Sequence, residues 1–393
     1  MRPPDDDLVE GRARRSGAFA TVAVMVALIA LLPFAAARLS GDGAAPADPA
    51  DAERASPGSP ARDLHGRLVF TTFEARGSLA RQQQLWVLDL ATGVLIEGPL
   101  VPAVEELWVA DADRGWLVLV AADAEAQGVA YLLTALTTTA APLQLGRGDV
   151  VSMSPDGTEL LLGRSEPIGR TAPACEGHRY ELERVSVASG ARSSVAEGRL
   201  RCGTLVAATL RGEVPLITFV RQGRLEVRAF GPEGESLLFR DLAAISTSPR
   251  GAVLFVDPEG EVPRGLGVWP RTPTGPLLVW PGSGSPRPFP DVRLYTQRVV
   301  AWSRTGGAAA IAGIVGDERG LWLVSVGTGA MTPLLPPNSF PLRSAFAGAA
   351  FDDLGRAFAG APGTLVVSTV DGLVPLPLPQ DAPSPVGPVA WLP

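Results

Sequence analysis

Short apolar runs separated by polar turns fill the chain from Leu68 onward. Runs of Val, Leu, Ile, Ala and Trp alternate with polar positions and end at Gly, Pro or Asp. Alternation over runs of this length is typical of half-buried β-strands. Nothing in this region combines the helical period with helix caps. The pattern therefore predicts an all-β domain over residues 66–393.

Two repeated units alternate along this domain. The first is a strand, a tight turn with glycine and a second strand; in its clearest copy, residues 151–163, Ser154-Pro155-Asp156-Gly157 supplies the turn chemistry. The second unit is a hairpin, and its copies cover residues 85–93, 131–145, 180–190, 225–234, 266–275, 321–329 and 364–372. One pair of units makes a four-stranded sheet of about 40 to 55 residues, the size of a propeller blade.

The triplet Val389-Ala390-Trp391 repeats Val300-Ala301-Trp302, which opens an earlier unit. The unit that starts at Leu68 lacks its first strand, so we expect the two ends of the domain to share one blade. With seven hairpins, this predicts a seven-bladed β-propeller closed by its N- and C-terminal strands. A β-sandwich, two smaller β-domains, or a ring of six or eight blades are the alternatives, because the units at residues 106–120 and 205–219 are degenerate.

An uncharged segment precedes the β-domain at residues 17–37. As a helix it would span about 30 Å, the thickness of the hydrocarbon core of a bilayer. Arg12, Arg14 and Arg15 precede it, so the positive-inside rule keeps residues 1–16 in the cytoplasm and exports the rest. The segment is interpreted as a single transmembrane signal-anchor; the alternative is a signal peptide cleaved after the alanines at residues 35–37. We therefore predict a single-pass protein of the cell membrane.

Residues 38–65 are rich in Ala, Pro, Gly, Ser and Asp and show no apolar period. This composition predicts a disordered linker between the membrane segment and the domain at residues 66–393. The net charge of the chain is −7, and the β-domain has no Lys/Arg-rich patch. Nucleic acid is therefore not an expected partner.

The Ser-Pro-Asp-Gly turn at residues 154–157, followed by hairpins such as residues 85–93, resembles the repeats of TolB-type propellers. The resemblance is also WD40-like in its blade pattern, although the Gly-His and Trp-Asp signatures of the WD family are absent. It covers most of residues 66–393 and implies an exported platform that binds proteins. Similar blades regulate some peptidases, but this chain has no G-x-S-x-G elbow leading from a strand into a helix.

The residues that could carry chemistry are few. The two histidines, His65 and His178, are expected at the linker boundary and in a solvated loop, and a zinc site would need more ligands. Calcium would need converging oxygen ligands, for which the candidates are Asp149, Asp156, Asp257 and Asp352. Each of these aspartates is already explained as a turn residue. We therefore predict no metal site, no cofactor and no catalytic residue.

Two further residue types have structural interpretations. Cys175 and Cys202 are the only cysteines, and an even pair in an exported domain predicts a disulfide, with two free thiols as the alternative. Most of the eight tryptophans sit in apolar strands and are expected to pack between blades rather than form a ligand-binding face.

These observations predict a non-catalytic, membrane-tethered, extracytoplasmic platform. It would bind a protein, a peptide or a component of the cell envelope at an end of the ring where loops cluster. One alternative is a propeller hydrolase, lyase or cyclase that uses carboxylates or calcium in its channel. Another is a purely structural role in an assembly.

Overall fold

The computed structural model describes residues 64–73, 82–122, 127–172, 175–221, 223–258, 275–338, 348–361, 363–369, 372–379, 382–385 and 388–393. The predicted anchor and nearly all of the predicted linker lie outside these residues. Within the described part, no helix has the length and apolar character needed to cross a bilayer. All regular elements of the described part are β-strands, as the alternating pattern predicts.

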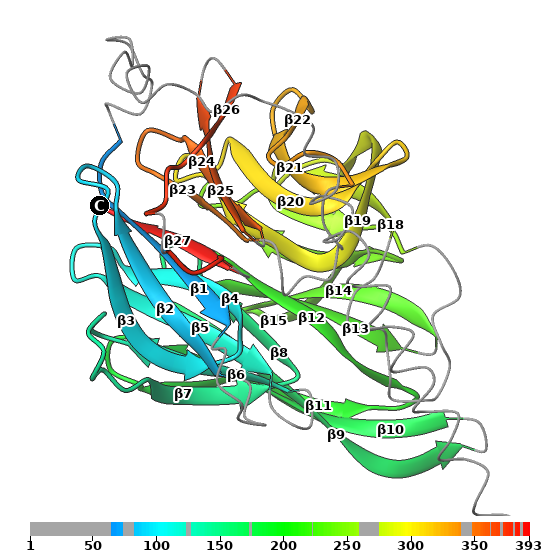
Figure 1. The fold of residues 1–393 in the computed structure, drawn as a ribbon. Coiled ribbons are helices and arrows are strands. Elements are labelled where there is room, and N and C mark those ends of the chain that lie inside the picture. Colours follow the sequence, from blue (N-terminus) through cyan, green and yellow to red (C-terminus); the bar gives the residue numbers. More distant parts are fainter. Residues whose placement is uncertain are drawn as a thin grey trace, which may run out of the picture. The chain divides into compact units, whose positions relative to one another are not determined.

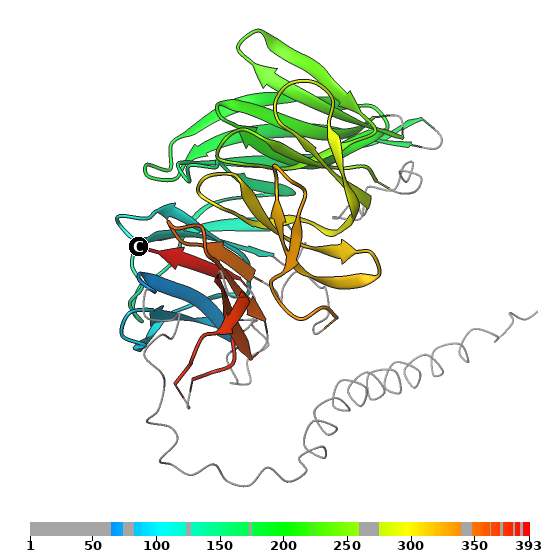
Figure 2. The ribbon, with the colours of Figure 1, turned by 90° about the horizontal axis from the view of Figure 1, so that it is seen from above.

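Sheet A joins the two ends of the β-domain. The C-terminal strand pairs with the first strand, so that Leu68 faces Trp391 and Phe70 faces Val389 (Figures 1 and 2). The predicted blade formed by both termini is therefore present. In order across the sheet its strands are β27 (Val389–Leu392), β1 (Arg67–Phe73), β2 (Gln82–Asp89) and β3 (Leu95–Pro102).

The next three sheets are antiparallel and have four strands each. Sheet B contains β4 (Val104–Asp111), β5 (Trp116–Ala122), β6 (Gly128–Leu133) and β7 (Leu143–Gly148). Sheet C contains β8 (Val150–Met153), β9 (Glu159–Ala172), β10 (Cys175–Ser186) and β11 (Arg192–Leu200). Sheet D contains β12 (Gly203–Arg211), β13 (Val214–Arg221), β14 (Arg224–Gly231) and β15 (Gly234–Arg240).

Sheet E has seven strands because the long strand β19 (Arg287–Trp302) pairs on one side with β18 and on the other with β20. Its other strands are β16 (Ala243–Thr247), β17 (Val253–Val256), β18 (Gly275–Trp280), β20 (Ala308–Val315), β21 (Glu318–Ser325) and β22 (Met331–Pro333). Sheet F contains β23 (Gly348–Phe351), β24 (Ala357–Ala361), β25 (Thr364–Thr369) and β26 (Gly372–Pro375).

One predicted hairpin is not where the repeat pattern placed it. Most of residues 266–275 lies outside the described residues, and Gly275 opens strand β18 instead of closing a turn. The hairpin of this unit is formed by β18 and β19, with the turn at residues 281–286. The pattern was misleading because Gly and Pro are frequent on both sides of this strand.

Apolar clusters join each sheet to the next. Leu119 of sheet B packs with Leu392 of sheet A, and similar clusters connect B to C, C to D, D to E and the two halves of E. A further cluster links E to F, and the last one packs Phe358 of sheet F with Phe70 of sheet A. The series of contacts therefore returns to the sheet from which it started, which is a propeller-like arrangement.

The antiparallel strands have two distinct ends. We call "turn end" the end where the first strand of each unit turns into the second, as at residues 154–157 and 303–306. We call "loop end" the opposite end, where the second strand of each unit connects to the third. Segments 74–81, 123–126, 173–174 and 259–274, all outside the described residues, are connections of this second kind.

The turns of the turn end are held by one repeated device. A Ser or Asp side chain accepts the N–H of a residue at or just before the start of the next strand, and a glycine with positive φ closes the turn. The acceptors are Ser154, Ser248, Ser303 and Asp352. At Gly157, with φ of 77°, a Cβ atom would lie 2.7 Å from the carbonyl oxygen of Val109, so only glycine fits.

Candidate functional site

A chain of hydrogen bonds connects three sheets at the loop end. We call it the loop-end network, and it consists of Gln127, Asp149, Ser165, His178 and Thr204. The amide of Gln127, beside sheet B, donates to the Asp149 carboxylate at 3.1 Å, and the backbone N–H of Ser165 donates to the other oxygen at 2.5 Å. The Ser165 hydroxyl lies 3.2 Å from His178 Nδ1 and 3.1 Å from the hydroxyl of Thr204 in sheet D.

The position of His178 differs from the prediction. It lies in strand β10 and is only 6% exposed, whereas the sequence predicted a solvated loop. The residue is buried because β9 and β10 continue as a paired hairpin well beyond the short strand β8. The segment before Tyr180 is therefore a strand, and its polar residues had to find partners inside the structure.

The Ser165–His178 contact resembles the pairing of a nucleophile with a base. However, Ser165 is also bonded to Thr204, so the hydroxyl is part of the packing between sheets C and D. A buried polar group without a partner costs about 1–3 kcal/mol, which the network avoids. The contacts therefore serve to hold the loop ends of three sheets in register.

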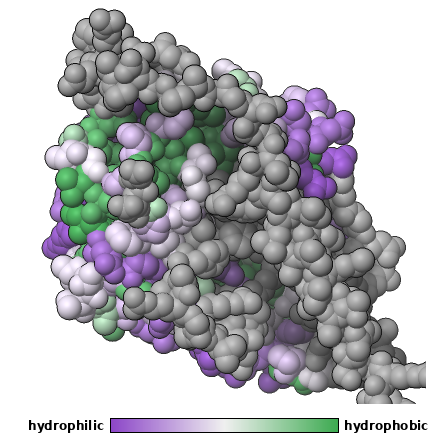
Figure 3. Space-filling model, viewed as in Figure 1, coloured by the Kyte–Doolittle hydropathy of each residue, from purple (hydrophilic) through white to green (hydrophobic). Residues whose placement is uncertain are grey.

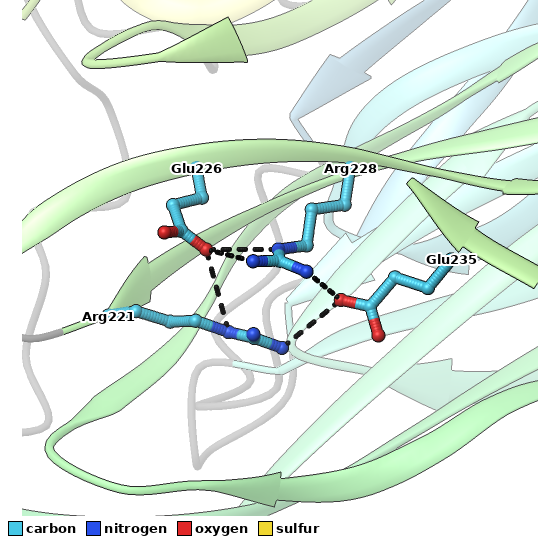
Figure 4. Close-up of polar contacts among 4 residues, drawn as sticks. All are labelled: Arg221, Glu226, Arg228 and Glu235. Atoms are coloured by element: carbon cyan, nitrogen blue, oxygen red, sulfur yellow. Dashed lines mark hydrogen bonds and ion pairs between the residues drawn. The ribbon is translucent and has the colours of Figure 1, made fainter. Parts of the chain in front are cut away.

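Four charged residues form a second polar cluster, on one face of sheet D (Figure 4). The Glu226 carboxylate accepts hydrogen bonds from Arg228 at 2.7 and 2.9 Å and lies 3.9 Å from Arg221 Nε. The Glu235 carboxylate accepts from Arg228 at 2.7 Å and from Arg221 at 3.3 Å. Among the described residues, Arg221 Nε is buried and has no hydrogen-bond partner. The two arginines and two glutamates together carry no net charge, which limits the free-energy cost of their partial burial.

This cluster borders an aromatic contact between sheets C and D. Tyr180 and Phe219 lie 4.9 Å apart between ring centroids, and the Arg221 guanidinium lies 5.2 Å from the Phe219 ring. Burial raises the pKa of Tyr180, and the nearby Glu235 raises it further. The tyrosine is therefore neutral at physiological pH and acts as a packing residue.

At the turn end, the entry of the chain into sheet A is fixed by His65. Its backbone oxygen accepts the indole N–H of Trp391 at 3.1 Å, and its ring packs edge-on against the same indole. His65 Nε2 lies 3.0 Å from the Asp353 carboxylate of sheet F. The two histidines therefore lie at opposite ends of the strands and share no site.

The four candidate calcium ligands are also separated. Asp149 and Asp257 lie at the loop ends of sheets C and E, whereas Asp156 and Asp352 lie in turns of the turn end. Asp352 is bound to Arg356 at 2.6 Å and Asp156 to Ser154 and Thr158. In the part of the chain that the structure describes, no three His, Cys, Asp or Glu residues gather as metal ligands.

One of the two cysteines can be placed in full. Cys202 lies between β11 and β12 with a positive φ of 56°, and it is not a free thiol. The side chain of Cys175 lies outside the described residues, so its pairing with Cys202 stays a prediction. Three tryptophans are buried in or beside the clusters between sheets, namely Trp280, Trp322 and Trp391.

Sequence reasoning missed both polar clusters. The charged cluster had a visible signal, because Arg224, Glu226 and Arg228 alternate with apolar residues along β14 and must share one face. The loop-end network had none, since Ser165 and Thr204 are far apart in the chain and only the packing of two sheets brings them together.

The chain matches no family model and no curated protein. Solved structures similar to it include TolB from Acinetobacter baumannii, with 14% identity and a TM-score of 0.43, covering 84% of this chain and 83% of that one. The acylaminoacyl peptidase of Pyrococcus horikoshii has 10% identity and a TM-score of 0.48, with 79% of this chain and 51% of the peptidase covered.

A third similar structure is the β-propeller domain of the Trilobed protease from Pyrococcus furiosus. It has 10% identity and a TM-score of 0.48, with 81% of this chain and 97% of that domain covered. At these values the three likenesses carry no argument about activity. The arrangement of the sheets rests on the strand pairing and the apolar clusters described above.

Proposed function

We propose that this protein is a membrane-tethered, extracytoplasmic, seven-bladed β-propeller that binds a protein, a peptide or an envelope component at its loop end. It acts as a platform without catalysis of its own. The observation that carries the proposal is the difference between the two ends of the strands. The turns from the first to the second strand of each unit are short and held by their own side chains, whereas the loop end carries the projecting hairpin β9–β10 and the longest connection within a sheet, residues 257–274.

The number of blades follows from the way sheet E is divided. If β19 serves as the last strand of one blade and the first strand of the next, sheet E supplies two blades and sheets A, B, C, D and F supply five. The apolar clusters support this division, since one cluster lies between the two halves of sheet E and the others lie between successive sheets.

The loop end is suited to binding because its hairpin β9–β10 extends beyond the sheet that supports it (Figure 1). Ile168 in this hairpin is exposed, and Arg179 and Glu197 form an exposed ion pair beside it. The loop-end network holds the base of the hairpin to its neighbours on both sides. Binding residues are often carried by connections that a rigid scaffold positions.

The tether at residues 17–37 and the disulfide Cys175–Cys202 belong to the same proposal, because both fit an exported domain. A disulfide there would fasten the hairpin to the start of sheet D and stabilise the loop end by about 3 kcal/mol.

The test is photocrosslinking in the cells that make the protein. A benzophenone amino acid replaces Ile168 at the loop end, and a matched variant carries it at Leu237, an exposed apolar position on β15. We expect one or more reproducible envelope adducts from position 168 and none of the same mass from position 237. Identical adducts from both positions, or none from position 168, would contradict binding at the loop end.

A further inference from the structure

The turn end carries most of the exposed large apolar side chains of the described residues. Eight such side chains are exposed, and five of them lie at the turn ends of the consecutive sheets F, A and B; these five are Val94, Ile96, Leu143, Leu354 and Leu373. Figure 3 shows apolar surface gathered over the region where Figure 1 places the turn ends of sheets A and F. We call these five residues the turn-end patch.

The chain enters the β-domain within this patch. Leu64 is buried against sheets A and F, and the oxygen of Gly66 accepts the backbone N–H of Leu90 next to the turn that leads to Val94. Asp353, which bonds to His65, is the neighbour of Leu354. Whatever precedes Leu64 in the chain is therefore delivered to the surface that the patch occupies.

Four carboxylates around the patch, those of Asp89, Asp111, Asp352 and Asp353, are already engaged by neighbours. Asp111 contacts Arg114 at 3.6 Å, Asp352 contacts Arg356, and Asp353 contacts His65. Asp89 accepts hydrogen bonds from the hydroxyl and the backbone N–H of Thr92, which lower its pKa. A carboxylate that is already hydrogen-bonded loses less solvation free energy than a free one when a membrane surface approaches. The burial of the apolar side chains is therefore opposed by a smaller desolvation cost.

We propose that the turn-end patch rests on the bilayer to which the protein is tethered, with its apolar side chains in the headgroup region. This inference rests on the membrane anchor of the proposed function. Residues 38–63 form the connection, and a flexible chain of that length has an end-to-end distance of about 28 Å. The patch is therefore held within reach of the membrane and would contact it repeatedly.

Lipid is the occupant favoured over a protein partner for two reasons. The covalent connection gives the membrane a high effective concentration at this end of the domain, which no soluble partner has. The patch itself is made of apolar side chains, and the ion pairs beside it combine charges of both signs, so its attraction to the membrane is apolar and needs no anionic lipid. Resting on this end would leave the loop end pointing into the compartment, free for the proposed partner.

The experiment uses the full chain reconstituted in vesicles of phosphatidylcholine and phosphatidylglycerol. Benzophenone replaces Leu354 or Ile96 in the patch, with Ile168 and Leu237 as matched exposed apolar controls elsewhere. Thermal melts establish that all four variants are folded. We expect lipid adducts at positions 354 and 96 to exceed those at positions 168 and 237 at least five-fold.

The outcomes separate this inference from the proposed function. Equal lipid adducts at all four positions, or adducts of positions 354 and 96 with a second copy of the chain, would overturn the docking while the anchor stands. Alkaline carbonate extraction of the same vesicles tests the anchor itself. Release of the protein by carbonate would overturn both the tether and the docking that rests on it.

Discussion

Polar side chains at the turn end and at the loop end find their hydrogen-bond partners in different parts of the structure. At the turn end, the turn residues Ser154 and Ser303 bond to the backbone within a few residues of themselves. At the loop end, Ser165 bonds to Thr204 of the neighbouring sheet. The hydrogen bonds of such a turn lie within its own unit, whereas the bond between Ser165 and Thr204 depends on the packing of sheet C against sheet D.

This difference has a functional meaning. A turn held by its own side chain leaves little room for variation in sequence, since its glycine is required by the backbone. Connections at the loop end differ more in length from unit to unit, from residues 316–317 to residues 257–274. The turn end is therefore suited to a constant role such as resting on a membrane, and the loop end to specific recognition.

The largest expected effect follows from removing β27, the C-terminal strand that pairs with β1. Removing residues 388–393 deletes β27, exposes Leu68 and Phe70 and breaks the apolar contact between sheets A and F. We expect the midpoint of urea unfolding to fall by more than half, because loss of Trp391 alone is worth about 3–5 kcal/mol. Deletion of the exposed Pro393 alone is the control and should leave the midpoint unchanged. An unchanged midpoint in the longer deletion would show that β27 does not hold the N-terminal and C-terminal parts of the β-domain together.

A second comparison separates backbone strain from steric contact at the turn end. Gly157 and Gly93 have similar positive φ values of 77° and 70°, but only a Cβ at position 157 would meet backbone atoms, those of Val109 and Ala110. Gly93→Ala should cost about 1 kcal/mol for the dihedral angle alone. Gly157→Ala should cost about 1–3 kcal/mol more, because the turn or β4 must shift. Equal losses in urea unfolding would mean that the turns do not pack against the neighbouring sheet.

A third comparison sets the network of the loop end against a turn. Ser165→Ala removes the hydroxyl that joins His178 to Thr204, and we expect a loss of about 1–2 kcal/mol of unfolding free energy. Ser189→Ala, in the exposed turn between β10 and β11, is the matched control and should cost a few tenths of a kcal/mol. If the two losses are the same, the loop-end network does not tie the sheets together.

The sequence predicted the features that depend on neighbours in the chain. The glycine turns, the strand alternation and the shared sheet of the two termini were all visible as repeats, since each unit folds into the same strands and turns. The prediction of a solvated loop at His178 was wrong, and the hairpin predicted at residues 266–275 is formed by β18 and β19 instead. The first depends on how far hairpin β9–β10 extends beyond its sheet and the second on the length of the connection after β17, and nothing in the local pattern of residues determines either length.

The candidate site was less predictable for a related reason. Ser165, Thr204 and Gln127 are ordinary polar residues in their own strands, and only the packing of three sheets makes them one network. The charged cluster of sheet D was predictable in part, because the alternation of β14 places Glu226 and Arg228 on one face. The contact of Glu235 with Arg221, across three strands, required the register of the sheet.

The smallest expected effect is the acid sensitivity of a single turn. Partial burial raises the pKa of Asp156, but hydrogen bonds from the Ser154 hydroxyl and from the N–H and hydroxyl of Thr158 outweigh it, so the pKa lies below its usual value. A carboxyl with a lowered pKa in the folded state stabilises the protein at neutral pH, and this contribution disappears as the pH falls through the folded pKa. Asp156→Asn should therefore reduce stability at pH 7 by less than about 1 kcal/mol, since the group is exposed to solvent. Urea unfolding of both proteins between pH 7 and about pH 2.5 should show the gap closing below the usual range for aspartate, near pH 4. A gap of constant size would mean that the turn is held by its backbone alone, and that turn end and loop end differ less than their side-chain bonds suggest.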